Sequence, residues 1–155
     1  MRSVKGPSPT AQLSRSLAKY TPEIAALARS ILARMRARLP GATELVYDNY
    51  NALVIGFGPS ERASEAIFSV AVYPKWVNLF FLQGASLSDP RKLLKGSGKI
   101  VRRVVINTAL DWDEPGVQSL ISQALARAKV PMDESGRRRL VIRSISVRQR
   151  PRRPA

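Results

Sequence analysis

The sequence predicts an α+β fold: a two-layer sandwich in which N- and C-terminal helices pack on an antiparallel sheet of about five to six strands. Two observations lead to this prediction. A helical pattern comes first, about five short strand-like segments follow one another, and a second helical pattern comes after them. The loops between the strands are also short, and short loops join antiparallel strands, whereas parallel crossovers need a dozen or more residues.

The composition favours one globular domain and excludes several kinds of site. A chain of 155 residues with 45% hydrophobic residues can bury a core. It contains no Cys and no His, which excludes disulfides, the usual zinc sites, Cys nucleophiles and His-based triads. No apolar run reaches the roughly 18–20 residues of a membrane span, and the first residues lack a secretory apolar region. We therefore expect no membrane span and a cytoplasmic location.

The first helix is predicted over residues 22–39, after a flexible N-terminal arm formed by residues 1–20, which are rich in Ser, Pro and small residues. Thr21 is a good N-cap, Pro22 suits the first helical position, and Pro40-Gly41 ends the helix. An apolar stripe at helical spacing indicates the face that packs on the sheet. It consists of Ile24, Leu27, Ala28, Ile31, Leu32, Met35 and Leu39.

The strands follow in order. Residues 44–47 and 52–57 form a predicted hairpin around Asp48-Asn49, and residues 66–73 and 76–82 form a second one around Pro74-Lys75. A loop over 58–65, a helical turn over 89–94 and a turn over 96–98 separate these strands from a fifth over 99–107.

The strand over 76–82 is apolar on both faces, and this affects the partner prediction. Trp76, Phe80 and Leu82 alternate with a second apolar set, Val77, Leu79 and Phe81. Helices on one side of the sheet would leave one set exposed. Either the 58–65 loop or the C-terminal segment covers that face, or it forms a homodimer interface or the wall of a ligand site.

The second helix is predicted to begin around Asp111 and to bury Val117, Leu120, Ile121, Leu125 and Ala128. The folded α+β domain then ends near residue 136, so that the chain divides into 1–20, 21–136 and an extension over 137–155. Leu140-Val141-Ile142 could dock as a sixth, edge strand. The extension is rich in arginine and has no acid, which suggests either a solubilising tail or non-specific nucleic-acid binding. Its arginines are Arg137, Arg138, Arg139, Arg143, Arg148, Arg150, Arg152 and Arg153.

Aromatic and amide residues at strand ends are the best candidates for a small-ligand pocket. Asn78 is notable because it interrupts an apolar strand, and a buried amide needs a hydrogen-bond partner. The alternative is that these residues only pack in the core. The candidates are Tyr47, Asn49, Tyr50, Tyr73, Trp76 and Asn78. A weaker anion site could use Lys99, Arg102 and Arg103, although the two arginines alternate on a strand and so point to opposite faces.

Evidence for catalysis or for a cofactor is weak. No elbow of the Gly-x-Ser-x-Gly type and no paired carboxylates are present, so we expect a non-enzyme without a cofactor. Asp111, Asp113 and Glu114 form an acidic cluster just before Pro115. Carboxylates at a helix start are usually capping groups, and a metal site is the alternative.

Long segments of the chain carry a family resemblance. They are VYDNYNALVIGFGP (46–59), VYPKWVNLFFLQGASLSDPRKLLKGSGKIVRRVVI (72–106) and RLVIRSISVRQRPRRP (139–154). These segments resemble the YdhG-like family, a bacterial domain of unknown function, and the last one is similar to the C-terminus of one branch. The resemblance spans roughly residues 20–154. It implies a compact α+β domain with an antiparallel sheet, and some relatives are described as frataxin-like iron chaperones.

Three functions therefore stay open. The favoured one is a non-catalytic module that binds a small ligand or another protein. The second is a basic accessory protein associated with nucleic acid. The third is a frataxin-like iron chaperone, although the first helix carries only Glu23 as an acid where that role uses an acidic ridge.

Overall fold

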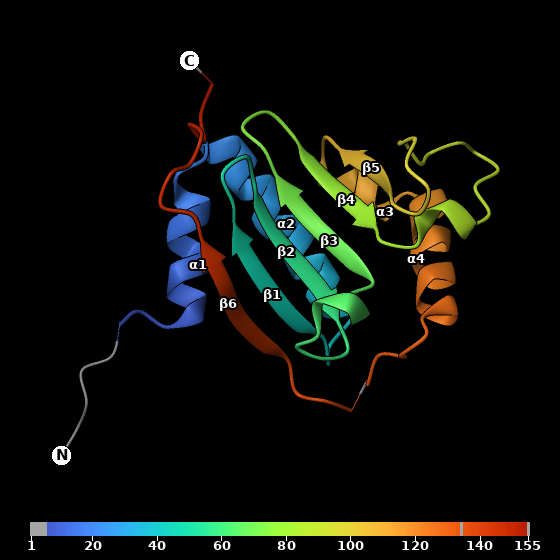
Figure 1. Ribbon diagram of the computed structural model, residues 1–155. Helices are drawn as coiled ribbons and strands as arrows, with labels where there is room; N and C mark the ends of the chain where they lie inside the picture. The colour runs from blue at the N-terminus through green and yellow to red at the C-terminus, as the bar shows by residue number, and fades with distance from the viewer. Residues whose placement is uncertain (1–5, 134, 155) are drawn as a thin grey trace.

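The computed structural model of the chain describes residues 6–133 and 135–154. It has an α+β fold in which helices pack on an open sheet of six strands, with the strand order β5-β4-β3-β2-β1-β6 (Figure 1). The helices are α1 (Pro9–Ala18), α2 (Pro22–Arg38), α3 (Ala109–Asp113) and α4 (Pro115–Arg127). The strands are β1 (Thr43–Asp48), β2 (Leu53–Gly58), β3 (Phe68–Val72), β4 (Val77–Phe81), β5 (Arg102–Ile106) and β6 (Arg139–Ile145).

The predicted α+β class and the two hairpins are confirmed, but the sheet is mixed. The pairs from β1 to β5 are antiparallel, as short loops require, whereas β6 runs parallel to β1. The chain leaves α4 and passes beneath the sheet to its far edge, where it becomes β6 (Figure 1). Because β2 to α4 lie between β1 and β6 in the sequence, the connection between these two strands far exceeds the dozen or so residues that a parallel pair needs.

The core lies between the sheet and the helices, with α2 behind the strands in Figure 1. As predicted, Thr21 caps α2: its hydroxyl oxygen accepts a hydrogen bond from the Ile24 amide at 3.3 Å. The predicted stripe packs into the core cluster with the inner face of the sheet. Its fully buried members are Ala28, Ile31, Leu32 and Met35, and they share the cluster with Ile55, Val70, Leu79 and Ile106.

The prediction of a flexible arm over residues 1–20 is wrong for its second half. Residues 9–18 form α1, and Ser8 caps it by accepting a hydrogen bond from the Ala11 amide. Leu13 and Leu17 are buried, and the hydroxyl of Tyr20 donates to the Val72 carbonyl at 2.8 Å. Only two apolar residues anchor this helix, so its composition looks like that of a linker. Residues 1–5 lie outside the described residues.

Two further elements differ from their prediction. The predicted helical turn over 89–94 is reduced to one turn over 89–92, closed by the Lys92 amide donating to the Asp89 carbonyl at 3.1 Å. The Asp89 carboxylate then accepts hydrogen bonds from the Leu93 and Leu94 amides at 2.9 and 2.8 Å. The second predicted helix is divided into α3 and α4 at Glu114-Pro115, because proline has no amide hydrogen to continue the helical ladder. The two short 3-10 turns, η1 (Ala63–Glu65) and η2 (Gly84–Ser86), were not predicted.

The C-terminal segment docks on the domain. The predicted edge strand at 140–142 is confirmed and extended to Arg139–Ile145, where it pairs with the full length of β1. Beyond β6 the chain turns along α1, as Figure 1 shows. Ion pairs hold both ends of this segment: Arg138 pairs with the buried Glu44 and Arg152 with the buried Asp48.

Candidate ligand-binding cleft

The sheet has one face covered by helices and one face without a helix over it (Figure 1). Strand alternation assigns the residues to these faces. In β4 the side chains of Val77, Leu79 and Phe81 are fully buried in the core, whereas Asn78 and Phe80 point to the other face. The predicted two-sided character of this strand is therefore confirmed.

The loop that contains η1 covers one end of the uncovered face. Ala66 lies within van der Waals reach of a side chain added at Gly56, and closer still at Gly58. Glu61 of the same loop pairs with Arg139 of β6, which fixes the loop over the β2–β1–β6 part of the sheet. One of the predicted covers, the 58–65 loop, is thus in place, but it leaves the β3–β4–β5 end open.

At that open end a cleft of about 560 Å³ lies on the sheet, which we call the sheet-face cleft. Its aromatic end is the β3–β4 hairpin, closed by a hydrogen bond from the Tyr73 amide to the Trp76 carbonyl at 2.9 Å. The rings of Tyr73 and Trp76 lie 5.7 Å apart at an angle of 31°. The cleft is lined by Tyr73, Lys75, Trp76, Asn78, Phe80, Arg103, Val105 and Asn107.

Asn78 is the buried polar residue of this cleft. Only 5% of its surface is exposed, and its Oδ1 atom has no hydrogen-bond partner among the described residues. It stands opposite Ala71 on β3 and Val105 on β5, two apolar neighbours that offer it no side-chain partner. A buried amide oxygen without a partner costs about 1–3 kcal/mol, so the protein retains it at the expense of stability.

Positive charge lies at both ends of the cleft. Arg103 is opposite Phe80, and Lys75 is in the hairpin turn beside Trp76. None of the ion pairs among the described residues involves Arg103 or Lys75. Among the residues that the structure describes, no carboxylate lines the cleft. The cleft therefore suits a ligand that carries negative charge.

The structure brings together three of the six predicted pocket residues, Tyr73, Trp76 and Asn78. Tyr47 is on the same face of the sheet as Asn78. A row of cross-strand pairs links the two residues: Tyr47 with Val54, Val54 with Ala71, and Ala71 with Asn78. Tyr47 is therefore three strands away from Asn78, or about 14 Å at the usual strand spacing. Asn49 and Tyr50 lie in the β1–β2 turn, where their carbonyls accept hydrogen bonds from Arg152. These three residues do not line the cleft.

Sequence reasoning missed part of the lining. Arg103 was expected only in an anion site with Lys99 and Arg102, and Lys75, Val105 and Asn107 were not singled out. Alternation along the fifth strand would have placed Arg103, Val105 and Asn107 on one face. The expected anion site does not assemble, because the Arg102 guanidinium turns away and donates to the Val101 carbonyl at 2.8 Å.

The acidic cluster is divided among separate partners. Asp111 caps α3 by accepting from the Asn107 and Thr108 amides, as the capping interpretation predicted. Asp113 accepts two hydrogen bonds from Arg34, which lower the pKa of its carboxyl group. Glu114 pairs with Arg91 and caps α4. Within residues 6–133 and 135–154, no three acidic side chains gather in a way that could hold a metal ion.

Several arginines of the C-terminal extension are used within the fold. Besides the pairs of Arg138, Arg139 and Arg152 already described, Arg143 donates to the Glu61 carbonyl and Arg153 to the Lys19 carbonyl. No ion pair of the described residues involves the other three, Arg137, Arg148 and Arg150. The segment is therefore a docked structural element rather than a free basic tail.

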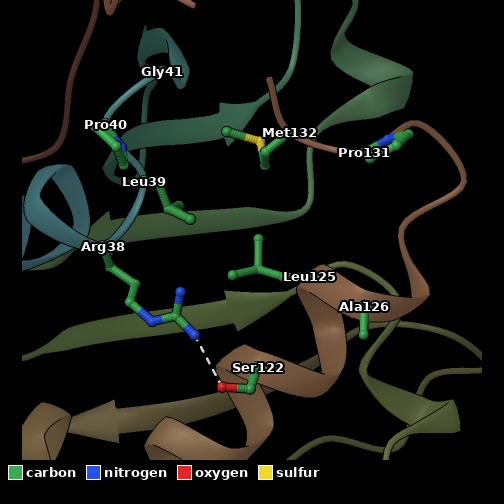
Figure 2. Close-up of a pocket in the computed structure, with 9 residues that line it drawn as sticks. All are labelled: Arg38, Leu39, Pro40, Gly41, Ser122, Leu125, Ala126, Pro131 and Met132. Atoms are coloured by element: carbon green, nitrogen blue, oxygen red, sulfur yellow. Dashed lines mark hydrogen bonds between the residues drawn. The ribbon is translucent and has the colours of Figure 1, made fainter. Parts of the chain in front are cut away.

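Figure 2 shows a second cavity of about 330 Å³, between the end of α2, α4 and residues 131–132. Leu39, Leu125 and Met132 line it, and its Arg38 side chain donates to the Ser122 hydroxyl at 2.9 Å. Neither of the two unpartnered buried polar atoms found in the described residues, Asn78 Oδ1 and Arg152 Nε, lies there. Of these two cavities, the sheet-face cleft is the one that contains a buried polar atom without a hydrogen-bond partner, Asn78 Oδ1.

Comparisons of the chain with protein-family models, with curated proteins and with solved structures find no match. The YdhG-like assignment therefore stays a prediction from the segments quoted above. Among the described residues, no helix combines the length and the apolar character needed to cross a bilayer.

Proposed function

We propose that this protein is a non-catalytic binding module that holds a small ligand with a planar ring in the sheet-face cleft. The observation that carries this proposal is the buried Oδ1 atom of Asn78, which has no partner within the described chain. The Oδ1 atom is shielded in this side-chain position, so we expect the Asn78 carboxamide to turn toward the cleft when a ligand N–H group donates to it, which would recover the free energy that the unpartnered amide costs.

The other walls of the cleft suit a planar ring. Trp76 is 43% exposed and Tyr73 lies beside it, so the pair offers aromatic surface on which a ring can stack. Phe80 and Val105 add apolar surface next to the amide. Apolar and aromatic walls around a few polar groups are the usual composition of small-molecule sites.

Nuclear magnetic resonance can test this proposal with the protein's own two tryptophans. Trp76 is in the cleft, whereas Trp112 is buried and its indole N–H donates to the Met35 sulfur at 3.4 Å. The probe is anilinonaphthalene sulfonate, an anion that carries planar aromatic rings and one N–H group. We expect a saturable shift of the Trp76 indole signal while the Trp112 signal stays in place.

Matched variants locate the binding. Trp76→Ala lacks the reporting indole, so binding to the variants is followed by the fluorescence of the probe; this variant should bind the probe about tenfold or more weakly, since aromatic stacking is a large part of the contact. Tyr50→Ala removes an aromatic residue of similar exposure (48%) outside the cleft and should leave binding unchanged. Equal effects of the two variants, or a shift confined to residues around Arg38 and Met132, would contradict the proposal.

A further inference from the structure

The two ends of the sheet-face cleft differ in chemistry. Trp76 and Tyr73 form an aromatic end, with Lys75 in the turn between them, and Arg103, opposite Phe80, supplies the charge at the other end, which has no such aromatic pair. Trp76 and Phe80 are four residues apart along β4, which corresponds to about 13 Å at the rise of an extended strand. A ligand that uses both ends must therefore separate its ring from its charge.

The middle of the cleft carries the amide. Asn78 lies two residues from Trp76 and two from Phe80, and Arg103 and Asn107 flank it diagonally on β5 at about 7–8 Å. A ring stacked at Trp76 would place its edge next to Asn78 Oδ1. That edge must carry an N–H donor, because a carboxamide oxygen only accepts.

These three requirements, taken in order along β4, describe one class of molecule. Building on the proposed function, we infer that the ligand is a nucleotide. Its base stacks at Trp76 and Tyr73, an amino or ring N–H of the base donates to Asn78 Oδ1, and its phosphate binds Arg103. The sugar spans the distance between ring and charge.

Simple aromatic acids fit less well. In a benzoate or an indole acetate the carboxylate is one or two bonds from the ring, so with its ring at Trp76 such an acid could meet Lys75 but would leave Arg103 without a partner. Arginine also favours phosphate, because its planar fork of donors matches two phosphate oxygens. The net charge of +15 attracts any anion, so charge alone would not distinguish these ligands.

The test compares AMP with its parts by titration followed at the Trp76 indole signal. The probes are AMP, adenosine, ribose 5-phosphate, indole acetate and a single-stranded oligoadenylate of six nucleotides. We expect AMP to bind about tenfold or more tightly than adenosine, as a charge-assisted hydrogen bond to phosphate predicts. Adenosine that binds as tightly as AMP would overturn the inference.

A matched pair of neighbouring arginines assigns the phosphate. Arg103→Ala should reduce AMP affinity to that of adenosine and leave adenosine affinity unchanged. Arg102→Ala removes an equal charge that points away from the cleft and should change AMP binding less than twofold. Equal losses in the two variants would show that only the long-range field acts, and would overturn the inference.

The remaining outcomes separate the two proposals and the two sources of a nucleotide. If anilinonaphthalene sulfonate shifts the Trp76 signal but no adenine compound does, the cleft binds ligands and the nucleotide inference fails. If no probe shifts it, both proposals fail. If the oligoadenylate binds more than sixfold more tightly than AMP, with the same dependence on Arg103, the nucleotide comes from a strand rather than from a free pool.

Discussion

The guanidinium of Arg152 and the carboxylate of Asp48 form an ion pair in the interior of the protein, with 2.9 Å between Nη2 and Oδ1. Both side chains are almost completely shielded from solvent. Ser16 donates to the other carboxylate oxygen at 2.7 Å, and the guanidinium lies 5.8 Å from the centre of the Tyr20 ring. This contact joins α1, β1 and the C-terminal segment at one point.

Loss of this pair should be costly. Arg152→Ala leaves the Asp48 charge buried without its partner, and we expect a decrease in the free energy of unfolding of about 3–5 kcal/mol. Arg153→Ala, which removes only an exposed hydrogen bond to the Lys19 carbonyl, should cost less than about 1 kcal/mol. Urea unfolding followed by circular dichroism measures both, and similar values for the two variants would refute the prediction.

A second buried acid, Glu44, allows a comparison between adjacent arginines. Glu44 is fully buried and accepts hydrogen bonds from Arg36 and Arg138. Arg138→Ala should cost about 1.5–3 kcal/mol, because it removes a charge-assisted hydrogen bond from a buried carboxylate. Arg139→Ala breaks an exposed pair with Glu61 and should cost about 0–1 kcal/mol. The reverse order in chemical denaturation would contradict this account.

The fold should lose stability at alkaline pH through Tyr20. Burial raises the pKa of its phenol to about 12, while the nearby Arg152 acts in the opposite direction. The folded state therefore holds the proton more tightly than the unfolded chain, so the free energy of unfolding should fall as the pH rises from about 10 to about 12, by roughly 2–3 kcal/mol.

Tyr20→Phe isolates this effect. The variant loses the hydrogen bond to Val72 and is less stable at pH 7, but its stability should fall less steeply between pH 10 and 12. Lysine titration is common to both proteins and cancels in the difference. Tyr50→Phe, at an exposed phenol, serves as the control. If the free energy of unfolding falls equally steeply with pH in wild type and Tyr20→Phe, the alkaline loss of stability does not come from the Tyr20 phenol.

Substitution of Asn78 should separate stability from binding. Asn78→Val replaces an unpartnered amide by a β-branched side chain that packs against Ala71 and Val105. We expect the free energy of unfolding to rise by about 1–2 kcal/mol, while affinity for ligands with an N–H donor falls. Thermal unfolding together with the indole titration checks both, and a less stable variant would show that the amide is satisfied internally.

The carboxyl of Asp113 should titrate differently without Arg34. Two hydrogen bonds from that guanidinium lower its pKa, so this contact stabilises the fold above the ordinary carboxyl range and is lost as the pH falls through the folded-state pKa. In Arg34→Ala the pKa should rise towards its usual value. Titration followed by carbon-detected nuclear magnetic resonance of the carboxyl group measures this pKa. An unchanged pKa in Arg34→Ala would show that the contact with Arg34 does not lower it.

Periodicity predicted the parts of the fold that depend on local burial. The alternation of Val77, Leu79 and Phe81 with Asn78 and Phe80 is sufficient by itself to identify the two faces of β4. The pocket candidates were chosen by residue type, as aromatic and amide residues near strand ends. Tyr73, Trp76 and Asn78 line one cleft because they lie within one tight hairpin.

The remainder depends on contacts between distant segments. Asp48 and Glu44 look like surface acids in the sequence. Their burial depends on arginine partners about a hundred residues later, Arg152 and Arg138, although Glu44 also has the nearer Arg36. The same applies to α1, whose few apolar residues gain their cover from the rest of the fold. Tyr47 was placed in the pocket wrongly, because residue type alone does not show how many strands separate two residues of the same sheet face.

The parallel pairing of β1 with β6 has a consequence for synthesis of the chain. Until the ribosome has added residues 138–152, β1 exposes an unpaired edge, and Glu44 and Asp48 lack their partners from that segment. The sheet therefore cannot be completed in the order in which its strands are synthesised. Until β6 is available, β1 is an unpaired edge strand that is prone to aggregation. Rapid translation of this stretch would shorten the exposure, and a chain that ended before residue 152 would leave the Asp48 carboxylate without its arginine partner.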